Sequence, residues 1–236
     1  MIDVIALDAD DTLWDNEIHY INAKAEFVRL LGAFHTRAEW IEQRLGVIEN
    51  DNVGVYGYGI KSFTLSMLEA AVEISGGRIH GADLERIIAL GRNMLASPME
   101  LFPYTRAVLE ELSPHWDLML ITKGDQFEQK TKIDHTGLAG YFRQIEIVGE
   151  KTPASYRSLL ERHRIDPSGF LMVGNSLRSD VLPVLALGGQ AVYIPYANTW
   201  AHENEMDATQ AQHGYYELEN LGQLPELVGR LVKGQG

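Results

Sequence analysis

The stretch IALDADDTLWD, residues 5–15, carries the residues best suited to chemistry. Asp8 and Asp10 follow an apolar run at 4–8 and stand two positions apart. An aspartate is ordinarily ionised at neutral pH, so Asp8 can attack an electrophile such as phosphorus without a base to activate it. Asp10 can protonate the leaving oxygen and later take a proton from the attacking water. Because Asp and Thr clusters also form turns and helix caps, DADDT alone does not decide between these interpretations.

Asp11 and Asp15 complete a dense cluster of negative charge with Asp8 and Asp10. Attack of a carboxylate on a phosphate brings two anions together, which is prohibitive unless a hard cation such as Mg2+ bridges them. Asp8 and Asp10 are therefore candidate metal ligands as well as catalytic groups. Asp11 is expected to serve the turn, with a solvated side chain, and Asp15 stands where the chain leaves the first strand.

A second candidate group is LITKGD, where Thr122 ends an apolar segment and Lys123 and Gly124 follow. A hydroxyl, free backbone N–H groups and a glycine that permits close approach suit a phosphate-binding loop. The alternative is an ordinary strand-to-helix turn with Asp125 as the helix cap. Lys123 is expected either to contact a substrate or to point into solvent.

Two further segments place polar residues after apolar runs. Lys151 comes soon after 145–149 and could neutralise a nucleophile and a bound phosphate together, although most lysines are simply solvated. In VGNSLRSD, Asn175 and Asp180 can offer oxygen atoms to a cation, directly or through water. Asp180 could equally be a first-turn aspartate favoured by the helix dipole.

The elements that position these residues alternate between two types. Apolar segments that read as buried strands lie at 4–8, 118–122, 145–149, 170–174 and 191–195, with a weaker one at 215–218. Helical patterns lie at 105–112, 127–136, 155–163, 180–187 and 224–232. Such alternation predicts an α/β fold, a parallel sheet covered by helices on both faces. The candidate residues follow four successive strands, so they should meet at the carboxyl edge of the sheet.

One interval interrupts the alternation. Residues 15–97 contain no convincing strand but four helical patterns, near 16–31, 37–49, 60–75 and 82–96. We expect a small all-helical domain here, inserted into a catalytic core formed by 1–14 and 98–236. The glycine-rich loop at 51–61 is interpreted either as a surface loop or as a loop that contacts substrate.

Composition excludes several classes of function. The chain has 236 residues, 45% of them hydrophobic, which is typical of a globular protein with a real core. Its net charge of −13 argues against a nucleic-acid polymer or a membrane surface as partner. Without cysteine, any metal must be held by oxygen or histidine ligands. No signal peptide or membrane span is evident, so we expect a cytoplasmic protein. We expect it to be a monomer or a homodimer. His202 is expected to be a solvated loop residue.

Taken together, these motifs resemble those of the haloacid dehalogenase superfamily. The matching residues are Asp8, Asp10 and Thr12 in DADDT, Thr122 in LITKGD, Lys151, and GNSLRSD through Asp180. The resemblance implies a Rossmann-like core, a mobile helical cap at 15–97, and an aspartyl-phosphate intermediate on Asp8. It also implies Mg2+ bound by Asp8, the backbone carbonyl of Asp10 and the fourth motif. This chain departs from the family pattern in having Asn175 where an acid is common, and Lys123 where a small polar residue is frequent.

The sequence therefore predicts a Mg2+-dependent phosphatase that hydrolyses a small phosphorylated metabolite. Asp8 would be the nucleophile and Asp10 the acid and base, Thr122, Lys123, Gly124 and Lys151 would bind the phosphate, and Asp8, Asp10, Asn175 and Asp180 would bind the metal. Three alternatives remain open at this point: a 2-haloacid dehalogenase using the same nucleophile, a phosphotransferase or mutase, and a non-catalytic regulatory module. Asp10 argues against the dehalogenase, because a departing halide needs no acid.

Overall fold

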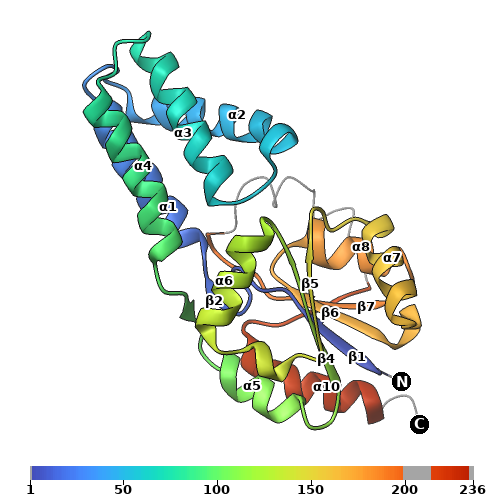
Figure 1. Cartoon of the computed structure of the whole chain (residues 1–236). Helices are drawn as coiled ribbons and strands as arrows, with labels where there is room; N and C mark the ends of the chain where they lie inside the picture. The colour runs from blue at the N-terminus through green and yellow to red at the C-terminus, as the bar shows by residue number, and fades with distance from the viewer. Residues whose placement is uncertain (1, 199–213, 234–236) are drawn as a thin grey trace. The chain divides into compact units, whose positions relative to one another are not determined.

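The computed structural model describes residues 2–198 and 214–233. His202, discussed above, and the end of the chain after 233 lie outside the described residues. The chain divides into two compact units (Figure 1). Met1–Glu17 and Met99–Gly236 form one, which we call the sheet unit, and Ile18–Pro98 forms the other, which we call the helical unit.

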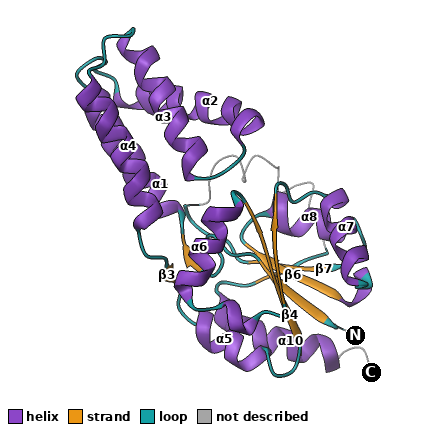
Figure 2. Ribbon diagram, in the orientation of Figure 1, coloured by secondary structure: helices purple, strands orange, loops and turns teal. Residues whose placement is uncertain are grey.

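A six-stranded, all-parallel sheet organises the sheet unit (Figure 2). The strand order is β5-β4-β1-β6-β7-β8. The strands are β1 (Val4–Leu7), β4 (Asp117–Lys123), β5 (Gln144–Val148), β6 (Phe170–Gly174), β7 (Gln190–Tyr193) and β8 (Tyr216–Glu217). Each predicted strand is present within two residues of its expected bounds, and the parallel α/β architecture is confirmed.

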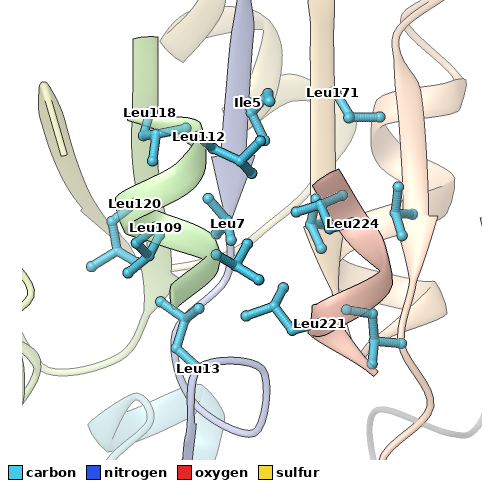
Figure 3. Close-up of a cluster of buried hydrophobic side chains, with 14 of the residues drawn as sticks. Ile5, Leu7, Leu13, Leu109, Leu112, Leu118, Leu120, Leu171, Leu221 and Leu224 are labelled. Atoms are coloured by element: carbon cyan, nitrogen blue, oxygen red, sulfur yellow. The ribbon is translucent and has the colours of Figure 1, made fainter. Parts of the chain in front are cut away.

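Alternate strand residues face opposite sides of the sheet and meet different helices. On one face, Ile5 and Leu7 pack with side chains of α5 (Thr105–Leu112) and α10 (Leu224–Lys233), as Figure 3 shows. On the other face, Ala6 and Met172 pack with α7 (Pro153–His163) and α8 (Leu182–Leu185). Two apolar layers therefore hold the sheet between helices, which explains why its central strands are near-continuous apolar runs.

The helices after β4 and β5 begin where local sequence signals place them. Asp125 accepts a hydrogen bond from the backbone N–H of Glu128 and caps α6 (Gln126–Thr136). Thr152 caps α7, and Pro153 occupies its first turn, where the missing N–H costs nothing. After β6, the helix predicted at 180–187 begins earlier, with a π-helical turn at Leu177–Val181, and continues as α8, which ends at Leu185. Asp180 lies in that turn.

A short antiparallel ribbon lies next to the start of the helical insert. β2 (Trp14–Asp15) pairs with β3 (Glu100–Leu101). Sequence analysis did not predict it, because a pair of two-residue strands is too short to show alternation.

The helical unit contains α1 (Glu17–Leu31) from its second residue onward, together with α2 (Ala38–Tyr56), α3 (Ile60–Ser75) and α4 (Gly81–Ala96). Its apolar core includes Phe27, Leu45, Met67 and Ile87. The prediction that α2 ends at 49 was wrong, and most of the expected loop at 51–61 is helical. The buried stripe of α2 turns polar at Glu49 and Asn52, which hides its periodicity in the sequence. Within the described residues, no helix combines the length and apolarity that a bilayer crossing requires.

Candidate active site

Four parallel strands bring the predicted residues together at the carboxyl ends of the strands, along one side of the sheet. The backbone N–H of Asp8 donates to the carbonyl of Val173, so Asp8 lies just beyond the hydrogen-bonded end of β1. Thr122 is the penultimate residue of β4, Lys151 follows β5, and Asn175 follows β6. The carboxyl edge of a parallel sheet is where ligand sites form in such folds.

Lys151 joins two of the predicted carboxylates. Its ammonium donates a hydrogen bond to Asp8 Oδ1 and another, 2.7 Å long, to Asp180 Oδ1. All three side chains are buried. Two buried carboxylates held so close would repel strongly, and the shared ammonium offsets that repulsion.

Burial governs the charge of this triad. Removal from water raises the pKa of Asp8 to about 7, although Lys151 opposes the shift. Burial also disfavours the Lys151 ammonium, but Asp180 and Asp8 outweigh it and raise the pKa of Lys151 above its ordinary value. Asp8 is therefore less acidic than an ordinary aspartate, and a cation bound beside it would favour the ionised nucleophile.

The backbone after β6 holds Asp180 in place. The N–H of Ser176 donates to Asp180 Oδ2 at 3.1 Å. A Cβ added to Gly174 would lie 2.1 Å from the same oxygen, so only glycine leaves room for the carboxylate. The Ser176 hydroxyl in turn accepts from the N–H of Ser179, which fixes the π-helical turn.

Thr12 links the nucleophile to Asn175. Its hydroxyl oxygen lies 3.0 Å from Asp8 Oδ2 and 3.2 Å from Asn175 Oδ1. The structure thus gathers oxygen atoms of Asp8, Asn175 and Thr12 at the ends of β1 and β6. The sequence motif includes Thr12, but sequence analysis assigned it no role.

Asp10 has its own set of partners. Trp14 Nε1 donates to Asp10 Oδ1 at 2.7 Å, and Gln129 Nε2 donates to Oδ2 at 3.0 Å. Lys132 Nζ lies 3.1 Å from Oδ1 and 2.9 Å from Oδ2. Sequence reasoning missed Gln129 and Lys132. Their spacing in the sequence could have indicated them, because Gln129, Lys132 and Ile133 are three and four residues apart, as on one buried face of a helix.

The loop after β4 differs in part from its prediction as a phosphate cradle. The Thr122 hydroxyl is buried and accepts a 2.5 Å hydrogen bond from Gln129. Gly124 has φ 135°, a conformation that glycine favours, but its N–H donates to the carbonyl of Val148. That N–H therefore extends the sheet instead of being free for a phosphate. Lys123 Nζ contacts Ser179 Oγ at 3.2 Å.

The other two aspartates of the opening cluster have structural partners. Asp11 has φ 62°, and its carboxylate accepts hydrogen bonds from the N–H groups of Asn16 and Glu17, each 2.9 Å long. The expectation that its side chain is only solvated was wrong; burial, helped by the neighbouring charge of Asp10, raises the pKa of Asp11 to about 7. Asp15 accepts a hydrogen bond from the hydroxyl of Tyr196.

The oxygen atoms beyond the carboxyl ends of the strands suit a hard cation. Asp8, Asp180 and Asn175 offer carboxylate and amide oxygens, which Mg2+ prefers. Among the described residues, no three His, Cys, Asp or Glu side chains form a metal-binding group. The side chain of Asp10 is engaged by Lys132, Gln129 and Trp14.

Comparison with known proteins identifies the family. Residues 2–188 match the model of the haloacid dehalogenase-like hydrolases, and the chain belongs to this family. A haloacid dehalogenase-like hydrolase from Xanthomonas campestris has a similar structure, with 36% identity and a TM-score of 0.88 over 99% of this chain and 93% of that one. The protein is therefore a hydrolase with the fold that its motifs predicted.

More distant relatives differ in their activities. The N-acylneuraminate-9-phosphatase of Mus musculus is 25% identical over 95% of this chain and 92% of its own length. A 2-haloacid dehalogenase from Pseudomonas syringae pv. Tomato DC3000 is 22% identical, with a TM-score of 0.64 over 98% of this chain and all of that one. The second similarity concerns the fold alone, so the chemistry has to be argued from the site.

Proposed function

We propose that this hydrolase is a Mg2+-dependent phosphatase acting on a small phosphorylated metabolite. The observation that carries the proposal is the pair Asp8 and Asp10. Asp8 lies against Lys151, whereas Asp10 is held separately by donors from Trp14 and α6. Phosphate-ester hydrolysis through a covalent intermediate needs both a nucleophile and a separate acid–base group.

Each residue has a role in this proposal. An Asp8 carboxylate oxygen bonds to phosphorus as the bond to the leaving oxygen breaks, and Asp10 gives that oxygen a proton. Water then attacks the aspartyl phosphate, Asp10 takes up its proton, and inorganic phosphate and free Asp8 result. Thr122 and Lys151 hold the phosphate, and Lys123 and Gly124 border it. Bound Mg2+, held by Asp8, the Asp10 carbonyl, Asn175 and Asp180, would offset the charge of nucleophile and phosphate.

We further propose that the sheet unit is the catalytic core and the helical unit its cap. The cap residues proposed to select the leaving group are the segment 51–61, which includes Lys61, and Arg29, which is exposed and paired with Glu26. Exchanging 51–61 for another sequence should change substrate preference. Unchanged preference across a substrate panel would refute this role.

The dehalogenase alternative finds less support in the site. A carbon–halogen bond breaks with departure of a halide, which needs no protonation, so a carboxylate held by several donors at position 10 would have no function. Transfer of the phosphate to an acceptor other than water remains compatible with the same residues. The net charge of −13 argues against a nucleic-acid polymer or a membrane surface as partner, so a small anionic substrate would depend on local positive charge or a bound cation at the site. The proposal includes a cytoplasmic location and a monomeric or homodimeric state.

The deciding experiment is a phosphate-release screen of the purified protein. The panel should contain sugar phosphates, nucleotides, phosphoglycolate and N-acylneuraminate 9-phosphate, with Mg2+ or with a chelator, and 2-chloropropionate as a dehalogenase substrate. We expect Mg2+-dependent phosphate release that Asp8→Asn abolishes. Halide release, absence of phosphate release, or full activity of Asp8→Asn would each contradict the proposal.

A further inference from the structure

One face of α6 contacts both Asp10 and Thr122, although no predicted site residue lies on this helix. Gln129 and Lys132 stand one turn apart and are 2% and 8% exposed. A buried lysine is unusual unless it is paired, and a buried amide must satisfy its donors. Both requirements are met by residues of the candidate active site.

The contacts with Asp10 fix both carboxylate oxygens. Lys132 Nζ lies 3.1 Å from Oδ1 and 2.9 Å from Oδ2, while Trp14 donates to Oδ1 and Gln129 to Oδ2. Donors on both oxygens, coming from two separate segments, restrict rotation of the carboxylate plane. Proton transfer depends on such alignment, because a displacement of about 1 Å can lower a rate roughly 100-fold.

Gln129 also sets the direction of the Thr122 hydroxyl. Gln129 Nε2 lies 3.0 Å from Asp10 Oδ2, and an amide nitrogen can only donate hydrogen bonds. The same nitrogen lies 2.5 Å from Thr122 Oγ1, which must therefore accept. The hydroxyl proton of Thr122 is then directed elsewhere and can be donated to a phosphate oxygen.

Lys132 has a second partner in the segment that leads to α1. Its ammonium lies 2.7 Å from Asn16 Oδ1, and Asn16 is buried. One ammonium thus fixes Asp10 relative to the chain that follows it. Lys151 performs a comparable task for Asp8 and Asp180, so the site contains two buried lysines with separate carboxylate partners.

We propose that Lys132 and Gln129 are positioning residues, through which α6 aligns the acid–base group Asp10 with the phosphate-binding Thr122. The inference rests on the phosphatase function proposed above. Lys132 acts on Asp10, and Gln129 acts on Asp10 and Thr122 together. Neither residue needs to touch the substrate.

The kinetic test compares Lys132→Met and Gln129→Met with Lys130→Met. Lys130 lies on the same helix but is exposed and pairs with Asp134, so its replacement is a matched control. Misalignment of an acid should matter most for a poor leaving group. We expect Lys132→Met to lower kcat for an alkyl phosphate by roughly 10- to 100-fold with little change in KM, and less for p-nitrophenyl phosphate.

Lys132→Arg is the conservative variant and should recover part of the lost kcat, because it keeps a buried cation and donors for Asp10. If Lys132→Met does not fold, Lys132→Arg takes its place in the kinetic comparison. Equal losses for alkyl and p-nitrophenyl phosphates in both Lys132→Met and Gln129→Met, or a loss in Lys130→Met as large as theirs, would overturn the proposal.

A measurement without substrate separates this inference from the proposed function. The indole N–H of Trp14 donates to Asp10, so its NMR signal, assigned with Trp14→Phe, reports where the Asp10 carboxylate lies. Lys132→Met and Gln129→Met should shift or broaden this signal, whereas Lys130→Met should not. If the wild-type protein released no phosphate, the proposed function would fail while the indole signal still tested the alignment. An indole signal unchanged in both variants would refute the alignment even in an active enzyme.

Discussion

The Asp180 carboxylate occupies the space that a side chain at Gly174 would need. A Cβ at position 174 would lie 2.1 Å from Asp180 Oδ2 and 2.3 Å from its Cγ. Real Cβ atoms do not approach other atoms so closely. Asp180 can therefore occupy its observed position only because residue 174, at the end of β6, is glycine. Through Asp180, it also affects Lys151 and the charge balance around Asp8.

The first prediction is that Gly174→Ala removes most of the activity by displacing Asp180. We expect kcat to fall at least about 100-fold, the effect of a displacement near 1 Å in a catalytic group. Gly140→Ala is the control, because a Cβ at 140 meets no atom within 4 Å. Phosphate release by both variants, with circular dichroism to check folding, measures the effect. Near-normal activity of Gly174→Ala would show that Asp180 can move without consequence.

A second prediction concerns metal binding in the absence of substrate. Ligands that bind only the folded state stabilise it, by about 2.7 kcal/mol at 100 times the dissociation constant. Mg2+ should therefore raise the thermal midpoint of the wild-type protein by several degrees, and a chelator should reverse the increase. Asp180→Asn should lose this response, whereas Asp134→Asn, which changes an exposed aspartate on α6, should keep it. An equal Mg2+ response in both variants would remove Asp180 from the ligand set.

The sequence predicted the parts of this structure that depend on chain order. Apolar runs identified the strands, and parallel strands end at one edge, so Asp8, Thr122 and Lys151 could be expected together. The partners of Asp10 could not be predicted in this way. Gln129 and Lys132 are polar residues on a helix, and only the three-dimensional structure shows that their buried face meets Asp10.

Buried polar residues also explain the main error in the helical unit. Periodicity identifies a helix by its apolar stripe, but the stripe of α2 continues through Glu49 and Asn52. Asn52 Nδ2 donates to Ser66 Oγ and to Glu69 Oε2 on α3, so a neighbouring helix supplies the hydrogen-bond acceptors that the buried Asn52 amide needs. Such compensation between helices leaves no local pattern in the sequence.

A third prediction tests the close approach of α3 and α4. A Cβ at Gly91 would lie 2.1 Å from the hydroxyl of Thr64, so Gly91→Ala should force these helices apart and destabilise the protein by about 1–3 kcal/mol. Gly46→Ala, in α2, meets no atom within 4 Å and should stabilise by roughly 0.5–1 kcal/mol, because alanine favours a helix interior.

Urea unfolding of both variants measures these changes. Thr64→Ala removes the nearest atom, so the double variant with Gly91→Ala should recover much of the lost stability. Similar unfolding free energies for Gly91→Ala and Gly46→Ala would show that the space between α3 and α4 adapts without cost.

The fourth prediction is a pH dependence of stability that arises from Glu49. Burial raises the pKa of Glu49 above its ordinary value, although Lys24, 3.4 Å away, opposes the shift. The folded protein therefore holds this proton more tightly than the unfolded chain does. Its contribution to stability is fully present below the ordinary pKa of glutamate and is lost as the pH rises through the raised pKa. Glu49→Gln cannot lose a proton, so its stability relative to wild type should increase over that range and then level off.

Glu73→Gln is the matched control for this measurement. Its hydrogen bonds with Arg44 lower the pKa of Glu73, so the stability that it contributes is lost only as the pH falls below the ordinary glutamate range. Urea unfolding from about pH 5 to about pH 8 should thus give a constant difference between Glu73→Gln and wild type but a rising one for Glu49→Gln. A difference for Glu49→Gln that stayed constant would mean that Lys24 compensates the burial of Glu49 completely.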